Sequence, residues 1–179
     1  GEVDAIKQLD SLSNIYPENS GILFFKTFIQ AEYGKNEEAL AGFDKLISLQ
    51  PDTSINWIGK GQVLAALNKH QEALSAFDKA TSLNPKRSDV WNMKAMEQAK
   101  LEKYDEAIVS LGKGIEINPN YPVNFYNRAC IYSIKGDKVN ALKDLKLAIT
   151  MNPDFKKSAV TDTDFKKLYE DEDFKALTK

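Results

Sequence analysis

Residues 54–87 read SINWIGKGQVLAALNKHQEALSAFDKATSLNPKR. Small and apolar residues recur there at spacings of three and four in two sets, Trp57, Gly61 and Leu64, and then Ala73, Phe77 and Ala80. Each set marks one face of a helix. Asn68, between the sets, tolerates the left-handed conformation that ends a helix. Pro85 lacks an N–H and disfavours helix in the residue before it, so the second helix should stop there. The stretch predicts an antiparallel helix hairpin.

The same pattern recurs along the chain with a period of 34 residues. The period is marked by prolines at Pro17, Pro51, Pro85, Pro119 and Pro153, and by alanines at Ala5, Ala39, Ala73, Ala107 and Ala141. A constant period indicates stacked repeats, because one hairpin cannot bury its apolar faces alone. We therefore expect four repeats, at residues 20–53, 54–87, 88–121 and 122–155.

The two ends of the chain differ from these repeats. Residues 1–19 align with the second half of a repeat, so we expect the second helix of a truncated repeat, with an apolar stripe of Ala5, Ile6, Leu9 and Leu12. We also expect the natural protein to continue N-terminally with more repeats; the alternative is a trimmed end that packs adequately. Residues 156–179 place Phe165 and Phe174 among many charges, which favours a C-terminal capping segment with a polar outer face over a tail that binds elsewhere.

The repeat pattern resembles the tetratricopeptide repeat, most closely at Trp57, Gly61, Leu64, Ala73, Phe77, Ala80 and Pro85. The resemblance implies an all-α fold, namely a right-handed α-solenoid of stacked antiparallel helix hairpins with C-terminal capping helices. It also implies a non-catalytic protein–protein interaction scaffold. In that family the first helices of the hairpins line a concave groove that holds a peptide.

Carried over by position, the predicted ligand-groove residues are Phe24, Phe28, Ile55, Ile58, Gln62, Asn92, Met96, Tyr126 and Cys130. The set is largely apolar, and grouped exposed apolar residues often mark interaction sites. Asn92 and Gln62 offer hydrogen bonds to a peptide backbone. For Phe24 and Phe28, the alternative is packing against the N-terminal helix or a missing hairpin.

Two other functions remain open. The array could be a structural spacer or self-association module that uses the open N-terminal edge. It could also be an RNA-binding helical repeat. The constant period of 34 residues and the net charge of −2 argue against RNA, because such repeats present a basic groove.

The composition narrows the chemistry further. The chain has 179 residues with one histidine, His70, and one cysteine, Cys130. Multi-histidine metal sites and internal disulfides are therefore excluded, and we expect no enzyme activity, cofactor, metal or nucleic acid. No apolar run reaches the roughly 18 residues that a membrane span needs, so we expect no membrane partner. One thiol and no visible secretory signal favour a cytoplasmic protein.

A ladder of bases runs through the first helices at Lys26, Lys60, Lys94 and Arg128, and acids recur in the second helices at Asp10, Asp44 and Asp78. The ladder has two interpretations. The bases could form a track for an anionic ligand. Alternatively, their stems pack between hairpins and their charged ends pair with the acids. We favour the second, which predicts a close contact from Lys60 to Asp44 or Asp78.

Overall fold

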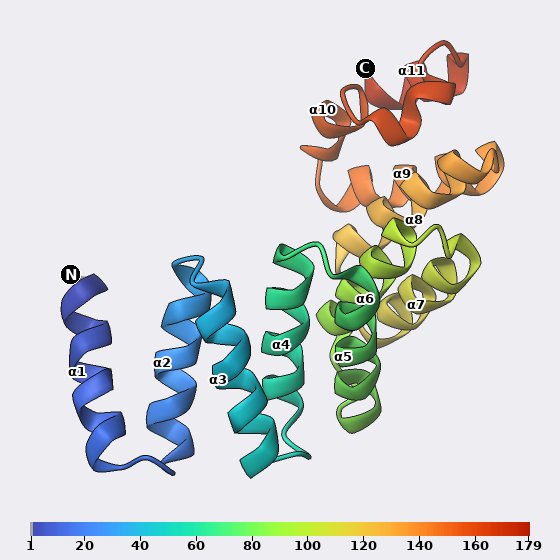
Figure 1. Cartoon of the computed structure of the whole chain (residues 1–179). Helices are drawn as coiled ribbons and strands as arrows, with labels where there is room; N and C mark the ends of the chain where they lie inside the picture. Colours follow the sequence, from blue (N-terminus) through green and yellow to red (C-terminus); the bar gives the residue numbers. More distant parts are fainter. Residues whose placement is uncertain (1) are drawn as a thin grey trace. The chain divides into compact units, whose positions relative to one another are not determined.

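The computed structural model describes residues 2–179, with side chains from Lys7 onward. Every regular element in this part of the chain is helical (Figure 1). The helices are α1 (Glu2–Ile15), α2 (Ser20–Glu32), α3 (Asn36–Leu49), α4 (Ser54–Ala66), α5 (His70–Leu83), α6 (Ser88–Lys100), α7 (Tyr104–Ile117), α8 (Pro122–Lys135), α9 (Lys138–Met151), α10 (Phe155–Ala159), the 3-10 helix η1 (Thr163–Leu168) and α11 (Glu172–Thr178). The predicted all-α fold built of helix hairpins is confirmed.

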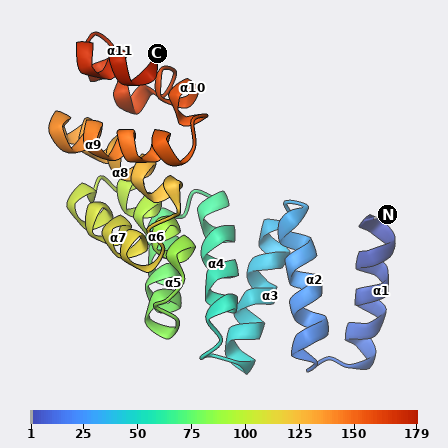
Figure 2. The ribbon, with the colours of Figure 1, turned by 180° about the vertical axis from the view of Figure 1, so that it is seen from behind.

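The chain divides into two compact units, Gly1–Pro85 and Lys86–Lys179. In the first unit, each helix from α1 to α5 packs on the next one along the chain. In the second unit, α6 to α9 do the same, and α10 and α11 pack on α9. Figures 1 and 2 show the antiparallel pairs α2–α3 and α4–α5 in the first unit, and α6–α7 and α8–α9 in the second.

Small residues let the two helices of each hairpin approach closely. Ala73 is fully buried, as are its equivalents Ala39, Ala107 and Ala141. Gly61 lies against the ring of Phe77, and a Cβ atom added there would sit 2.7 Å from Phe77 Cε1. The pairing therefore depends on the absence of a side chain at Gly61.

The turn between paired helices requires a left-handed residue. Gly34 and Gly136 adopt φ values of 72° and 81° there, and Asn68 and Glu102 adopt 58° and 59°. Glycine and asparagine tolerate this conformation, whereas it strains glutamate. Glu102 is thus the strained member of the set.

In the first hairpin, α2 carries the larger of two contacting residues and α3 the smaller. Thr27 stands in α2 where the equivalent residues are Gly61, Ala95 and Ala129. The hairpin accommodates it because α3 carries Gly42 opposite: a Cβ atom added at Gly42 would lie 2.1 Å from Thr27 Oγ1. Thr27 is fully buried, so a side chain added at Gly42 would press on an atom of the core.

Replacing Gly42 with alanine should therefore destabilise the protein by about 1–3 kcal/mol through overpacking. Thr27→Ala in the same chain should recover part of this loss, because it removes the two nearest atoms, Oγ1 and Cγ2. Gly112→Ala is the matched control, since the nearest atom there is 3.7 Å away; it should stabilise α7 by up to about 1 kcal/mol through helix propensity. Urea denaturation followed by circular dichroism measures all three changes. Equal effects at Gly42 and Gly112 would contradict the packing argument.

The C-terminal segment folds onto the last hairpin. The side chain of Asp162 accepts a hydrogen bond from the Asp164 backbone N–H and caps η1. Phe165 and Phe174 then enter one apolar core with Leu145 of α9. The segment thus covers α8 as well as α9, because η1 packs directly on α8.

The N-terminal helix leaves apolar surface open. Leu9 is half-buried, and Leu12, Ile15 and Tyr16 are exposed. The predicted stripe residues Ala5 and Ile6 lie outside the side chains that the structure describes. Self-association through this edge stays a prediction.

Candidate functional site

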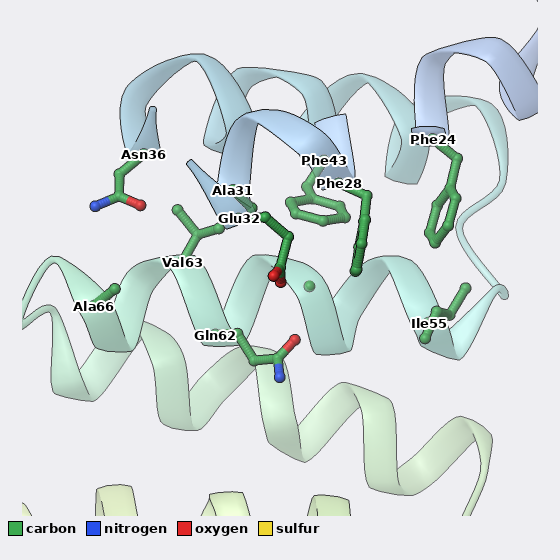
Figure 3. Close-up of a pocket in the computed structure, with 11 residues that line it drawn as sticks. Phe24, Phe28, Ala31, Glu32, Asn36, Phe43, Ile55, Gln62, Val63 and Ala66 are labelled. Carbon is green, nitrogen blue, oxygen red and sulfur yellow. The ribbon is translucent and has the colours of Figure 1, made fainter. Parts of the chain in front are cut away.

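An open cleft of about 650 Å³ lies in the first unit between α2 and α4, with α3 behind it (Figure 3). Its walls include four residues of the predicted groove, Phe24, Phe28, Ile55 and Gln62. Phe24 and Phe28 are one helical turn apart in α2, and their rings stack with centroids 6.3 Å apart. The repeat register thus brings side chains from two repeats to one hollow.

The floor of the cleft depends on the ring of Phe43, from α3. Phe43 is 2% exposed and lies against the backbone of α4 at Gly59. A Cβ atom added at Gly59 would sit 2.2 Å from Phe43 Cζ. The glycine therefore allows an aromatic floor, and Phe28 and Ile55 remain 48% and 40% exposed at the walls.

Three polar side chains stand around this apolar interior. They are Glu32 at the end of α2, Asn36 at the start of α3 and Gln62 of α4 (Figure 3). Among the described residues that line the cleft, Glu32 alone is charged. Within the described part of the chain, Glu32 forms no ion pair. The cleft is thus apolar, with one available negative charge.

A second cleft adjoins the first and shares Phe24 and Ile55 with it. It has a volume of about 490 Å³ and adds uncharged polar groups from Gln50, Thr53 and Asn56. Asn56 is buried, and its Nδ2 atom has no hydrogen-bond partner among the described residues. Phe24 and Ile55 therefore form an apolar ridge between a charged cleft and an uncharged polar one.

In the second unit, Asn92 is engaged by the protein itself. It donates from Nδ2 to Asn124 Oδ1 at 2.9 Å. Asn124 is fully buried and donates to Ser88 Oγ at 2.9 Å, and that hydroxyl donates to the carbonyl of Gly114 at 2.9 Å. This network ties α6 and α7 to α8, so the amide N–H of Asn92 serves packing between repeats. Met96 stays half-buried.

Tyr126 and Cys130 are enclosed rather than open to a ligand, being 7% and 6% exposed. Tyr126 stacks on Phe155 with ring centroids 4.5 Å apart, and its hydroxyl donates to Asp162 Oδ2 at 2.8 Å. Burial raises the pKa of the Tyr126 hydroxyl, and the bond to Asp162 raises it further. The capping segment thus occupies the groove positions of the last repeat, which the sequence had suggested would be open.

Cys130 Sγ lies 3.7 Å from Asp162 Oδ2, and Asp164 completes a group of three potential metal ligands that the sequence had not revealed. Burial raises the pKa of the Cys130 thiol, and the nearby carboxylates raise it further. Burial also raises the pKa of Asp164, and the nearby charge of Asp162 raises it further. A metal needs the thiolate, and Asp162 already accepts hydrogen bonds from Tyr126 and Asp164. The group works as the anchor of the capping segment.

Ile58 of α4 is 3% exposed, so it belongs to the core, and a ligand in the neighbouring cleft cannot touch it. Its place in the repeat register had suggested an open groove residue. Burial of such an apolar side chain is itself favourable.

The charged ladder is paired as the structural interpretation predicted. Lys60 Nζ lies 2.6 Å from Asp44, and Lys26 Nζ lies 2.7 Å from Asp10. Arg128 instead binds Asp144 of its own hairpin through two nitrogens, at 2.6 and 3.1 Å. The reason lies in the preceding repeat, where the position equivalent to Asp44 and Asp10 is glycine, Gly112.

The tetratricopeptide repeat family models match residues 55–87, 88–121 and 124–155, which together make up more than half of the chain. No curated protein sequence matches the chain. None of the described helices has the length and apolar character that a membrane crossing needs.

Solved structures with the same fold include a crystal structure of MamA, with 20% identity and a TM-score of 0.80 over 85% of this chain and 89% of that one. MamA from Desulfovibrio magneticus RS-1 has 16% identity and a TM-score of 0.81, over 85% of this chain and 86% of that one. YrrB is described as a TPR protein with an unusual peptide-binding site. It has 18% identity and a TM-score of 0.76, over 94% of this chain and 88% of that one. At these identities the likeness shows the fold.

Proposed function

Because the chain belongs to the tetratricopeptide repeat family, we propose that it is a non-catalytic scaffold that holds a peptide segment of a partner protein in the cleft between α2 and α4. The observation that carries the proposal is the open apolar cleft, whose walls keep Phe28 and Ile55 exposed above the buried ring of Phe43. Covering such surface is favourable by roughly 25 cal/mol per Å² of apolar area. A partner side chain that enters the cleft supplies that cover.

The rest of the chain supports a single binding region in the first unit. The groove positions of the last repeat are filled by the capping segment, which encloses Tyr126 and Cys130. The bases of the ladder at Lys26, Lys60 and Arg128 are paired with acids, which disfavours a track for an anionic ligand. YrrB has a similar fold and is described by its peptide-binding site, which agrees with the same use here.

Selection of phage-displayed random peptides on the full chain tests the proposal. We expect short peptides with about micromolar affinity, and Phe28→Asp should weaken their binding at least about tenfold, because it places a charge on the apolar wall. Val139→Asp is the control, since Val139 is 77% exposed on α9 and does not line the cleft. Fluorescence anisotropy of the selected peptides gives the affinities. Selected peptides that bind the Phe28→Asp chain as tightly as the original would refute the cleft as the site.

A further inference from the structure

We infer that the cleft between α2 and α4 is selective for an extended segment in which one residue separates an apolar residue from a lysine or arginine. This inference rests on the proposed function and adds the chemistry of the ligand. The apolar side chain enters above Phe43, between Phe28 and Ile55. The cation lies beside Glu32.

The charge of the cleft sets the sign of the ligand's charge. Glu32 is the only charged residue among the described residues of its lining, and it extends from α2 toward α4 (Figure 3). The neighbouring polar groups, Asn36 and Gln62, are neutral. In the described part of the chain no base forms an ion pair with Glu32, so a ligand cation meets a carboxylate that is free to pair. An acidic ligand would be repelled at the same place.

The helix geometry sets the spacing between the two ligand side chains. Phe28 and Glu32 are four residues apart in α2, which corresponds to a separation of about 6 Å along the helix axis. An extended chain advances about 3.3 Å per residue, and residues i and i+2 point to the same face. The apolar and cationic side chains of an extended ligand therefore reach the cleft together when one residue separates them.

The adjoining cleft accounts for the other end of the ligand. Beyond the ridge of Phe24 and Ile55, the lining is polar and uncharged, with Gln50 and Thr53. These groups suit peptide backbone rather than a charged side chain. The ligand thus lies with its cation at the Glu32 end of the cleft and uncharged residues at the Gln50 end.

Labelled synthetic peptides of the form Ser-Gly-Phe-Ser-Lys-Ser-Gly, with blocked ends, test this pattern in fluorescence anisotropy with the full chain. Replacing the lysine by glutamate should weaken binding about tenfold or more, and moving it next to the phenylalanine should weaken binding several-fold. Glu32→Gln should remove the difference between peptides with lysine and with serine, and Glu32→Lys should reverse the preference. Glu116→Gln, an exposed acid of α7, is the control and should change nothing.

The outcomes separate this inference from the proposed function. If the lysine and glutamate peptides bind equally, or if Glu32→Lys leaves the preference unchanged, the charge selectivity is wrong, while binding lost in Phe28→Asp keeps the cleft as the site. If the lysine works only four residues from the phenylalanine, the ligand is helical, and the extended pattern is overturned. If peptide binding is insensitive to Phe28→Asp, both conclusions fall.

Discussion

Replacing Phe165 with alanine should lower the free energy of unfolding by about 3–5 kcal/mol, the usual cost of deleting a buried aromatic ring. The ring is fully buried, and its centroid lies 5.7 Å from the rings of both Tyr126 and Phe174. Removing the ring deletes part of the contact by which η1 covers α8. Urea denaturation followed by circular dichroism measures the change.

The alkylation rate of Cys130 provides a second measurement for the Phe165→Ala variant. Cys130 is the only cysteine and lies under the same segment, and burial raises the pKa of its thiol. Since the thiolate is the reactive form, alkylation should be slow in the original chain and faster in Phe165→Ala. Val160→Ala, at a position 47% exposed, is the control and should alter neither measurement. A Phe165→Ala chain with unchanged stability and unchanged thiol reactivity would show that the segment is not part of the core.

Replacing Arg128 with methionine should destabilise the protein by about 3–5 kcal/mol. The side chain of Asp144 is only 3% exposed and would keep a buried charge without its partner. The double variant Arg128→Met with Asp144→Leu should recover much of the loss, because a buried ion pair replaced by apolar residues is often nearly neutral. Thermal denaturation of the single and double variants gives the coupling between the two residues.

The pair Lys60–Asp44 provides a matched comparison for the buried one. The Asp44 side chain is 53% exposed, and exposed ion pairs contribute about 0–1 kcal/mol. Lys60→Met should therefore have a small effect. If Lys60→Met and Arg128→Met were equally costly, burial would not be what distinguishes the two pairs.

The period of 34 residues predicts the architecture well, because each hairpin buries its faces against neighbours that carry the same pattern. It places Phe24, Phe28 and Ile55 in one hollow and anticipates the contact of Lys60 with Asp44. These features repeat along the chain, so a rule about position is enough to find them.

The period fails where the structure departs from repetition. The capping segment has no place in the register, so the burial of Tyr126 and Cys130 could not be derived from their positions in α8. The aromatic residues of that segment, Phe165, Tyr169 and Phe174, were the available signal that it packs on an apolar surface. Likewise, Asn92 and Asn124 form a hydrogen bond although they are 32 residues apart in the sequence. A rule that considers the positions of one repeat at a time cannot predict such a pair.

The switch of Arg128 from the preceding hairpin to its own has a consequence for protein engineering and for evolution by duplication. Its repeat brings its own counter-charge, so it could be moved to another place in the order without losing that partner. The repeat 54–87 could not be moved freely, because Lys60 would face Gly112 if its unit followed 88–121. Arrays in which the repeats are reordered should thus differ in stability even if they match the consensus equally well. The difference should depend on which repeats contain the acid that pairs with their own base.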